Sequence, residues 1–289
     1  MSAPLRFHGR EPASGRALVM AIVNRTPDSF YDHGANFGHE AAMAAVRAAI
    51  DDGADIVDIG GVKAGPGAEV DTAEEVRRVV PFVAAVRAAH PDVLISVDTW
   101  RSQVGALACS EGADIPNDTW AGADPLLGEV AAACGAGIVC SHTGGARPRT
   151  RPHRVRYTDV VADVIYEVTS QAERLVALGV PRDGILIDPA HDFGKNTWHG
   201  LELLRRADEL VATGWPVLMA LSNKDFVGEA LGVGLTERVE GTLAATALAA
   251  AAGVRVFRAH NVAATRRTVD MVASVRGTRP PARCVRALA

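Results

Sequence analysis

The chain has 289 residues, of which 48% are hydrophobic and 22% charged, and its formal net charge is −4. This length is ordinary for an α/β barrel, and a chain of roughly 300 residues buries about three quarters of its unfolded surface. The slightly acidic balance does not favour nucleic acid or an anionic membrane as a partner, and no stretch approaches the ~20 apolar residues of a membrane span.

Eight short apolar runs alternate with eight helical stretches along the chain. The runs are nearly continuous, which indicates parallel strands covered on both faces. They are residues 17–23, 54–59, 93–97, 113–115, 137–140, 184–187, 216–221 and 253–257. The helical stretches are residues 39–52, 72–89, 101–111, 125–134, 157–178, 197–212, 237–251 and 263–275.

This strict alternation predicts an α/β protein, a (β/α)8 TIM barrel with a single domain. We place the barrel in residues 1–275 and a basic C-terminal extension in residues 276–289. An open doubly wound sheet is the alternative. It would need a glycine-rich phosphate loop after the first strand, where residues 24–29 are NRTPDS.

The cysteines point to a reducing environment. Cys109, Cys134, Cys140 and Cys284 form neither a CxxC pair nor a Cys/His metal pattern. The N-terminal residues 1–16 also lack the apolar core of a secretory signal. We therefore expect buried, reduced thiols and a cytoplasmic location.

Polar side chains follow every predicted strand. In a barrel of this kind the carboxyl ends of the strands meet at one rim, which carries the active site. The residues that reach this rim are Asn24, Asp58, Asp98, Asn117, Asp118, His142, Asp188, Ser222, Asn223, Lys224, Arg258 and His260. So many convergent polar groups predict a ligand site.

The residue types at this rim indicate the kind of ligand. Asp98 and Asp188 can accept hydrogen bonds from the N–H groups of a planar amino-heterocycle, and Asn117 and Lys224 can complete its edge. A second group is suited to phosphate oxygens, alone or with Mg2+, and consists of Asn24, Arg258 and His260. A heterocycle joined to a pyrophosphate would match both groups.

Seven segments resemble dihydropteroate synthase in order and spacing, across residues 17–275. They are MAIVNRTPDSFYD, DIVDIGG, SVDT, GADIPND, IDPAHDFGKNTWHGLELL, SNKDFVGEALG and FRAHNV. The resemblance implies an enzyme that joins p-aminobenzoate to hydroxymethyl-dihydropterin pyrophosphate, that binds sulfa-type analogues, and that is a cytoplasmic homodimer. It implies catalysis by positioning and by stabilisation of the leaving anion.

The resemblance also implies a role for each matching residue. Asp98, Asn117, Asp188 and Lys224 would bind the pterin, and Asn24, Arg258 and His260 would bind the pyrophosphate, with Asn24 touching Mg2+. Phe193 and Ser222 would line the p-aminobenzoate side. Lys224, Arg258 and His260 would be the catalytic residues.

The chain departs from the family in the loops that act on the second substrate. Where the family has GGESTRP, residues 60–66 are GGVKAGP, so that the arginine is absent. Losing an arginine contact to a desolvated anion lowers a reaction rate by a factor of roughly 10²–10⁴. Asn223 replaces the arginine of an SRK motif, and Ala190 and Asp192 replace glycines. Asp192 adds a negative charge that would repel anionic substrates.

These departures predict a pterin pocket that is retained in a homologue with impaired or absent synthase activity. An active synthase is the first alternative. A pterin-binding methyltransferase that serves a corrinoid partner is the second, and a non-catalytic partner of a true synthase is the third. One loop is rich in arginine, with Arg147, Arg149, Arg151, Arg154 and Arg156. It is a solvated segment, a basic flap that attracts an anionic substrate or, least favoured, a contact for nucleic acid.

Overall fold

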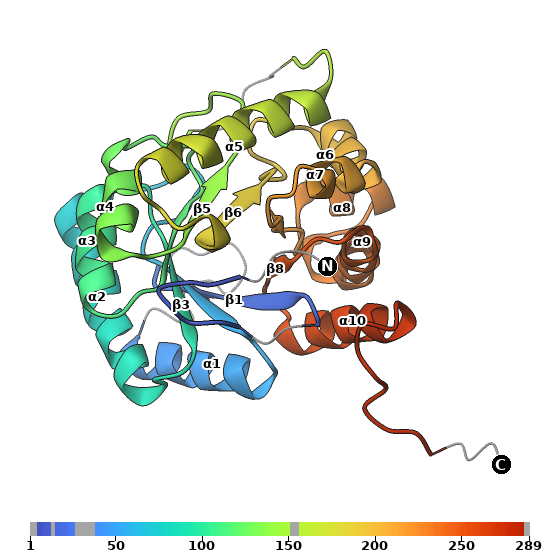
Figure 1. Ribbon diagram of the computed structural model, residues 1–289, viewed down its shortest axis with the longest axis horizontal. Coiled ribbons are helices and arrows are strands. Elements are labelled where there is room, and N and C mark those ends of the chain that lie inside the picture. Colours follow the sequence, from blue (N-terminus) through green and yellow to red (C-terminus); the bar gives the residue numbers. More distant parts are fainter. Residues whose placement is uncertain (1–4, 13–14, 27–37, 151–155, 286–289) are drawn as a thin grey trace.

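Eight parallel strands form the centre of the structure, a computed structural model that describes residues 5–12, 15–26, 38–150 and 156–285 (Figure 1). The strands are β1 (Leu18–Asn24), β2 (Ile56–Gly60), β3 (Leu94–Asp98), β4 (Ile115–Asp118), β5 (Ile138–Ser141), β6 (Ile185–Asp188), β7 (Leu218–Met219) and β8 (Val256–Ala259). They are ordered β6-β5-β4-β3-β2-β1-β8-β7, and a parallel bridge between Ile187 and Val217 joins β6 to β7. The sheet therefore closes into the predicted barrel.

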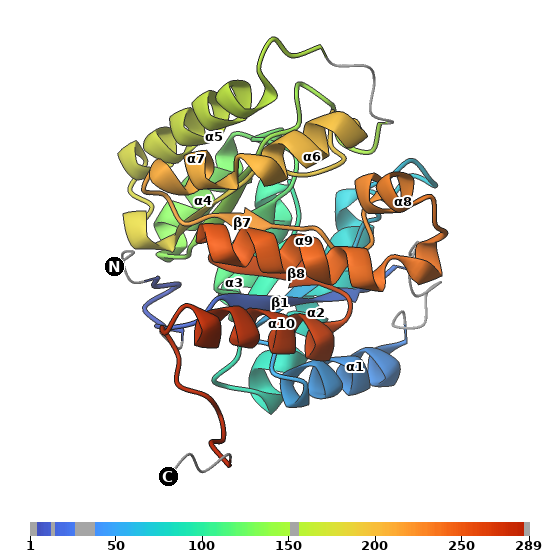
Figure 2. The same ribbon diagram turned by 90° about the vertical axis from the view of Figure 1, so that its right-hand side faces the viewer.

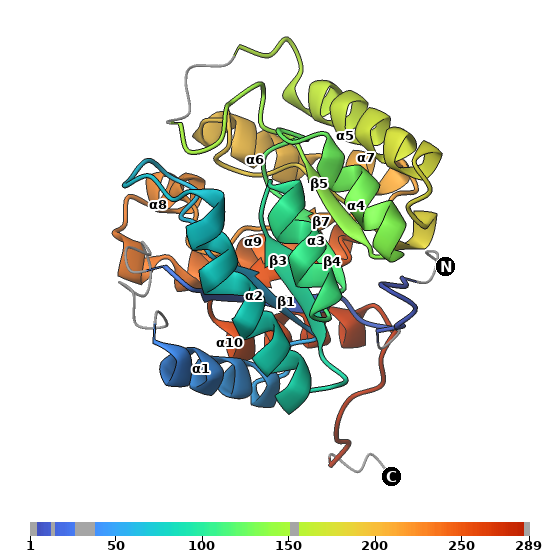
Figure 3. The ribbon, with the colours of Figure 1, turned by 90° about the vertical axis from the view of Figure 1, so that its left-hand side faces the viewer.

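Helices surround this barrel, as the two side views show (Figures 2 and 3). They are α1 (His39–Asp51), α2 (Thr72–Ala89), α3 (Ser102–Ser110), α4 (Leu126–Cys134), α5 (Val160–Ala177), α6 (Thr197–Arg205), α7 (Ala207–Ala212), α8 (Asp225–Leu231), α9 (Val239–Ala252) and α10 (Val262–Val275). All eight predicted helical stretches are helical in the structure. The stretch 197–212 forms two helices, because the helical conformation is interrupted at Arg206. Helix α8 was not predicted.

Apolar side chains fill the amino-terminal end of the barrel. Leu18, Met20 and Ile56 point into the same buried cluster, to which Leu5 and Phe7 contribute from the N-terminal segment. Their neighbours in the strands, such as Val19 and Val57, pack outward beneath the helices. Alternate residues thus face two apolar environments, which explains the continuous apolar runs. With one end closed by this cluster, polar groups gather at the other end.

The cysteines and the C-terminal segment differ in their surroundings. All four cysteines are free. Cys109 and Cys140 are buried, as expected, whereas Cys134 is only partly buried and Cys284 is exposed, which contradicts the prediction for Cys284. Beyond α10, Arg279 lies 3.6 Å from Asp270, and residues 281–285 are exposed. No helix in the described ranges has the length and apolar character of a membrane span.

Candidate functional site at the carboxyl ends of the strands

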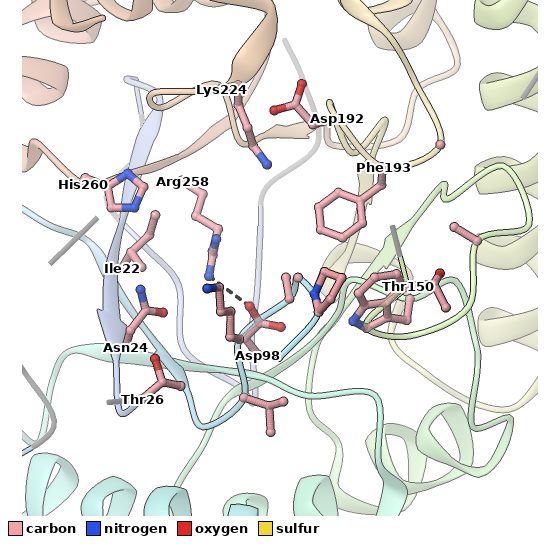
Figure 4. Close-up of a pocket in the computed structure, with 18 residues that line it drawn as sticks. Ile22, Asn24, Thr26, Asp98, Thr150, Asp192, Phe193, Lys224, Arg258 and His260 are labelled. Atoms are coloured by element: carbon pink, nitrogen blue, oxygen red, sulfur yellow. Dashed lines mark hydrogen bonds and ion pairs between the residues drawn. The ribbon is translucent and has the colours of Figure 1, made fainter. Parts of the chain in front are cut away.

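A cavity of about 320 Å³ opens at the carboxyl ends of the strands. Its lining includes six of the predicted site residues, Asn24, Asp98, Phe193, Lys224, Arg258 and His260. Figure 4 shows these side chains around one space, together with Ile22, Thr26, Thr150 and Asp192. Residues 62–66, from the altered loop after β2, complete the wall. The structure therefore brings together groups from β1, β3 and β8 and from the loops after β2, β6 and β7.

Arg258 is the best-anchored cation of the site. Its Nε donates to Asp58 Oδ2 at 2.6 Å, and its Nη2 donates to Asp98 Oδ2 at 3.0 Å. Asp58 also accepts hydrogen bonds from Ser96 Oγ at 2.6 Å and Asn117 Nδ2 at 3.2 Å. Asp58 therefore orients Arg258 from β2, a role that the sequence did not indicate.

Two buried carboxyl groups have perturbed acidities. Burial raises the pKa of Asp98 to about 7, although the neighbouring Arg258 acts to lower it. Burial also raises the pKa of Asp188 to about 6, against the lowering effect of the Ala190 N–H and Lys224. Both carboxyl groups thus titrate near neutral pH, which is typical of functional sites.

The other three predicted residues are buried around the cavity and do not line it. Asn117 is 1% exposed, and its Oδ1 has no hydrogen-bond partner among the described residues. Asp188 accepts from the Ala190 N–H at 2.7 Å. Ser222 Oγ lies 3.0 Å from His260 Nδ1. Ser222 therefore positions His260, and its own access to a ligand is small.

His260 carries no charge at neutral pH. Burial, followed by the neighbouring cations Arg258 and Lys224, lowers its pKa to about 3. A neutral imidazole can exchange hydrogen bonds with a ligand but adds no positive charge. The cationic groups of the cavity are therefore Lys63, Lys224 and Arg258 among the residues that line it.

An aromatic wall faces these cations. The Lys224 Nζ lies 5.1 Å from the centre of the Phe193 ring, and Trp120 packs edge-on against Phe193 at 5.0 Å. Trp120 is only 4% exposed. It comes from the turn after β4, two residues beyond the last residue that the sequence assigned to that strand end, and its place in the cavity was missed.

The loop after β6 has a left-handed backbone conformation at two positions, although neither residue is glycine. Ala190 and Asp192 have φ angles of 48° and 72°, and Asn223 in the next loop has 57°. Such angles are uncommon outside glycine, although Asn and Asp tolerate them best. The Asp192 Oδ2 accepts a hydrogen bond from the Asp225 N–H at 2.9 Å, which ties the loop to α8. This hydrogen bond links the residues next to Phe193 and Lys224, whose side chains face each other across the cavity.

Gly194 is the one position in this loop where only glycine fits. Its φ is 62°, and a Cβ there would lie 2.2 Å from the Thr143 carbonyl oxygen. The loop after β6 therefore lies directly against the loop after β5. This contact sets the position of Phe193, the residue that precedes Gly194.

Parts of two sequence motifs lie outside the described residues. Asn24 and Thr26 line the cavity, but the rest of the first motif falls in residues 27–37. Of the arginine-rich loop, Arg151 and Arg154 are outside the described ranges. Arg147 and Arg156 do not line this cavity, whereas Thr150 does. The basic flap that the sequence left open has no described arginine at this cavity.

Comparisons with known proteins agree with this architecture. The profile of the family described as "Pterin binding enzyme" matches residues 20–260. A Mycobacterium leprae protein named "Inactive dihydropteroate synthase 2" is 67% identical over 285 residues, which cover 97% of this chain and 98% of that protein.

Solved structures of related synthases have the same fold. The Yersinia pestis dihydropteroate synthase in a sulfonamide complex is 34% identical with a TM-score of 0.89, covering 96% of this chain and 100% of that one. The Thermus thermophilus dihydropteroate synthase in complex with 4-aminobenzoate is 35% identical with a TM-score of 0.84, covering 94% and 100%. The chain therefore belongs to the pterin-binding enzyme family and is a homologue of dihydropteroate synthase.

Proposed function

We propose that the chain binds a pterin at the carboxyl ends of the strands and performs the synthase reaction poorly or not at all. One observation carries the proposal. The residues deep in the site are present, with Asp98 and Lys224 in the wall of the cavity and Asn117 and Asp188 buried, while the loop after β2 brings Val62, Lys63, Ala64 and Gly65 to the cavity and no arginine. The name of the M. leprae relative, "Inactive dihydropteroate synthase 2", supports the same conclusion.

The pterin would be held by Asp98, Asn117, Asp188 and Lys224. The Asn117 Oδ1, which has no partner in the described part of the chain, and the carboxylates of Asp98 and Asp188 are acceptors for the ring N–H groups. Lys224 would donate to a ring nitrogen or carbonyl. Because a buried acceptor without a partner costs about 1–3 kcal/mol, a ligand that satisfies Asn117 gains that free energy.

The leaving pyrophosphate would meet Asn24, Arg258 and His260. Arg258 already interacts with two carboxylates, Asp58 and Asp98, so its positive charge is largely compensated before any anion arrives. Neutral His260 adds none. The site therefore offers less net charge to a developing pyrophosphate than an intact arginine loop would supply.

Magnesium would enter with the pyrophosphate. The described ranges contain no group of three or more His, Cys, Asp or Glu side chains suited to a metal ion. Mg2+ usually takes only one or two protein ligands and completes its shell with water and phosphate oxygens. Asn24 fits this need, since its side chain lies in the cavity beside Gly60 and Asp98. The ion would shield the charge of the pyrophosphate there.

The p-aminobenzoate side would lie between Phe193 and the loop after β2. Phe193 and Lys224 already face this space, whereas Ser222 reaches it only through His260. The missing loop arginine and the added Asp192 both weaken attraction for a carboxylate or a pyrophosphate. An active synthase is therefore the less favoured alternative.

Calorimetry with 6-hydroxymethylpterin tests the binding half of the proposal. We expect one site per chain with a dissociation constant at or below about 100 µM. A turnover assay with hydroxymethyl-dihydropterin pyrophosphate, p-aminobenzoate and Mg2+ should give a rate at least about 100-fold below that of an active synthase. No detectable pterin binding would overturn the proposal, as would synthase-like turnover.

Pterin affinity should depend on pH. The folded-state pKa of Asp98 is raised to about 7, so its carboxylate acceptor is present above that pH and is lost as the pH falls. If ring N–H groups require this acceptor, the dissociation constant of 6-hydroxymethylpterin should rise about tenfold between about pH 8 and about pH 6. A dissociation constant that stays constant over this range would exclude the ionised Asp98 as the acceptor.

Asp192 should weaken anion binding. In Asp192→Asn the amide oxygen can still accept from the Asp225 N–H, and asparagine tolerates the positive φ, so the substitution mainly removes charge. We expect inorganic pyrophosphate to bind about fivefold more tightly in calorimetry at low salt. Asp225→Asn is the matched control, because Asp225 lies next to the same contact but does not line the cavity. Equal effects of the two substitutions would contradict a local role for Asp192.

We further propose a cytoplasmic homodimer, as the family resemblance implies. Large apolar side chains are exposed on three neighbouring helices, Trp198 on α6, Leu231 on α8 and Leu248 on α9. A second copy of the chain would cover them. Sedimentation should give a dimer that Trp198→Glu converts to a monomer, and a monomeric parent chain would refute the assignment.

A further inference from the structure

A second and larger cavity lies beside the one described above. Its volume is about 740 Å³, within the range of small-molecule sites. It is formed by Trp100 after β3, the turn after β4, the loop after β5 and one face of α5, the helix labelled at the upper right of Figure 3. It shares only Trp120 and Ala146 with the lining of the first cavity. The proposed pterin site uses none of its other residues.

Three arginines border this second cavity, and none of them has a carboxylate partner among the described residues. Arg147 and Arg156 come from the loop after β5, and Arg174 comes from α5. Their guanidinium groups form no salt bridge within the part of the chain that the structure describes, in which many other arginines are paired. Guanidinium groups of this kind bind phosphate and carboxylate well.

The acids of the cavity do not cancel this charge. The Asp163 carboxylate lies 2.8 Å from the buried His142 Nε2, and the Nδ1 of the same ring lies 2.8 Å from Lys195 Nζ. Asp163 therefore interacts with His142 in the cavity wall and contributes one negative charge. Glu167 is the one further acidic residue among the lining side chains, against three arginines. The cavity thus has a net positive charge.

Aromatic rings form another part of the wall. Trp100 and Trp120 pack edge to face at 6.4 Å, and Tyr157 is fixed by a hydrogen bond from its hydroxyl to the Gly194 carbonyl at 2.9 Å. Trp120 also packs against Phe193 and is almost fully buried, so it supports the wall from behind. Trp100 and Tyr157 are only partly buried, and these fixed rings can present flat apolar surface to a ligand, as in many ligand sites.

We propose that this second cavity is a separate small-molecule site for an anionic ligand that carries a ring. The anion, a phosphate or a carboxylate, would bind to Arg147, Arg156 and Arg174, and the ring would pack against Trp100 and Tyr157. The inference does not require that a pterin binds in the first cavity.

Phenyl phosphate and benzoate are suitable probes, with inorganic phosphate as the probe that lacks a ring. Trp100 and Trp120 are two of the four tryptophans, so saturable quenching of tryptophan fluorescence reports binding, and calorimetry confirms it. We expect at least one ring-bearing probe to bind at least tenfold more tightly than inorganic phosphate. Which of the two binds better identifies phosphate or carboxylate as the preferred anion.

Variants locate the bound probe. Arg156→Ala combined with Arg174→Ala should raise the dissociation constant at least tenfold, and both residues are exposed, so the fold should tolerate the changes. Arg47→Ala, an exposed arginine on α1, is the matched control and should have no effect. Asp98→Asn in the first cavity should also leave the probe affinity unchanged.

Three results would overturn the proposal. The first is that neither ring-bearing probe binds saturably up to about 10 mM. The second is an affinity that the double arginine variant leaves unchanged or that Asp98→Asn abolishes, since the probe would then occupy another site. The third is equal affinity for inorganic phosphate, because the aromatic wall would then take no part. None of these results bears on whether a pterin binds.

Discussion

Replacing Asp98 by asparagine is expected to weaken the binding of 6-hydroxymethylpterin about 100-fold, equivalent to about 2.7 kcal/mol. The carboxylate of Asp98 is an acceptor at the base of the cavity, and the amide would present an N–H group to the ring N–H groups of the ligand. Asp98→Asn also removes one of the two charges that neutralise Arg258. Calorimetry on the parent chain and the variant measures the effect.

The control for this experiment is Asp163→Asn. Asp163 borders the second cavity and is absent from the lining of the first, so pterin affinity should stay within about twofold of the parent value. The melting temperature of each variant would show whether the fold is retained. Equal pterin affinity in the parent chain and Asp98→Asn would remove Asp98 from the pterin site.

Restoring the loop after β2 is expected to raise synthase turnover. The combined substitutions Ala64→Thr and Gly65→Arg return the two side chains that the family places there, and a correctly placed arginine stabilises a leaving phosphate strongly. Within the described ranges the position has room for a side chain, since a Cβ at Gly65 would contact only Lys63 Cε there, at 3.9 Å. We expect about a 100-fold increase in kcat over the parent chain with p-aminobenzoate, the pterin pyrophosphate and Mg2+.

The control is an arginine introduced at another position of the same loop. Ala68→Arg adds the same guanidinium to an exposed residue three positions further along, outside the lining of the cavity. It should change kcat by less than about twofold if position rather than net charge is decisive. An equal gain in both variants would assign the effect to long-range attraction. If the restored loop gave no increase in kcat, the loop after β2 would not be the cause of the low rate. Asp192 and Asn223 would then be the remaining substitutions to test.

The barrel and most of the site could be predicted because each depends on local sequence patterns. A strand buried on both faces must be apolar throughout, and its first polar residue marks the carboxyl end. This rule located Asn24, Asp98 and Asp188 at the ends of β1, β3 and β6. The strands begin one to three residues later than the predicted apolar runs, and all except β7 also end one to three residues later, because the strand pairing includes the polar residues at the carboxyl end.

Features that depend on contacts between distant segments could not be predicted. Asp58 lies in the middle of β2, and its pairing with Arg258 on β8 follows only from the closure of the barrel. Trp120 resembles any core aromatic in the sequence, and its contact with Phe193 is set by the two loops. Helix α8 is too short for its periodicity to be distinguished from a loop. The second cavity lies between α5 and the loops after β3, β4 and β5, which are far apart in the sequence.

The central claim is that the pterin site is retained while the chemical step is impaired, and a single-turnover experiment tests both parts together. The chain is held in excess over labelled hydroxymethyl-dihydropterin pyrophosphate, with Mg2+ and saturating p-aminobenzoate, and pyrophosphate release is followed as the protein concentration rises. We predict a rate that saturates with protein, because the pterin binds, and whose plateau is at least about 100-fold below that of an active synthase. A plateau as high as that of an active synthase, or a rate that never saturates, would contradict the claim.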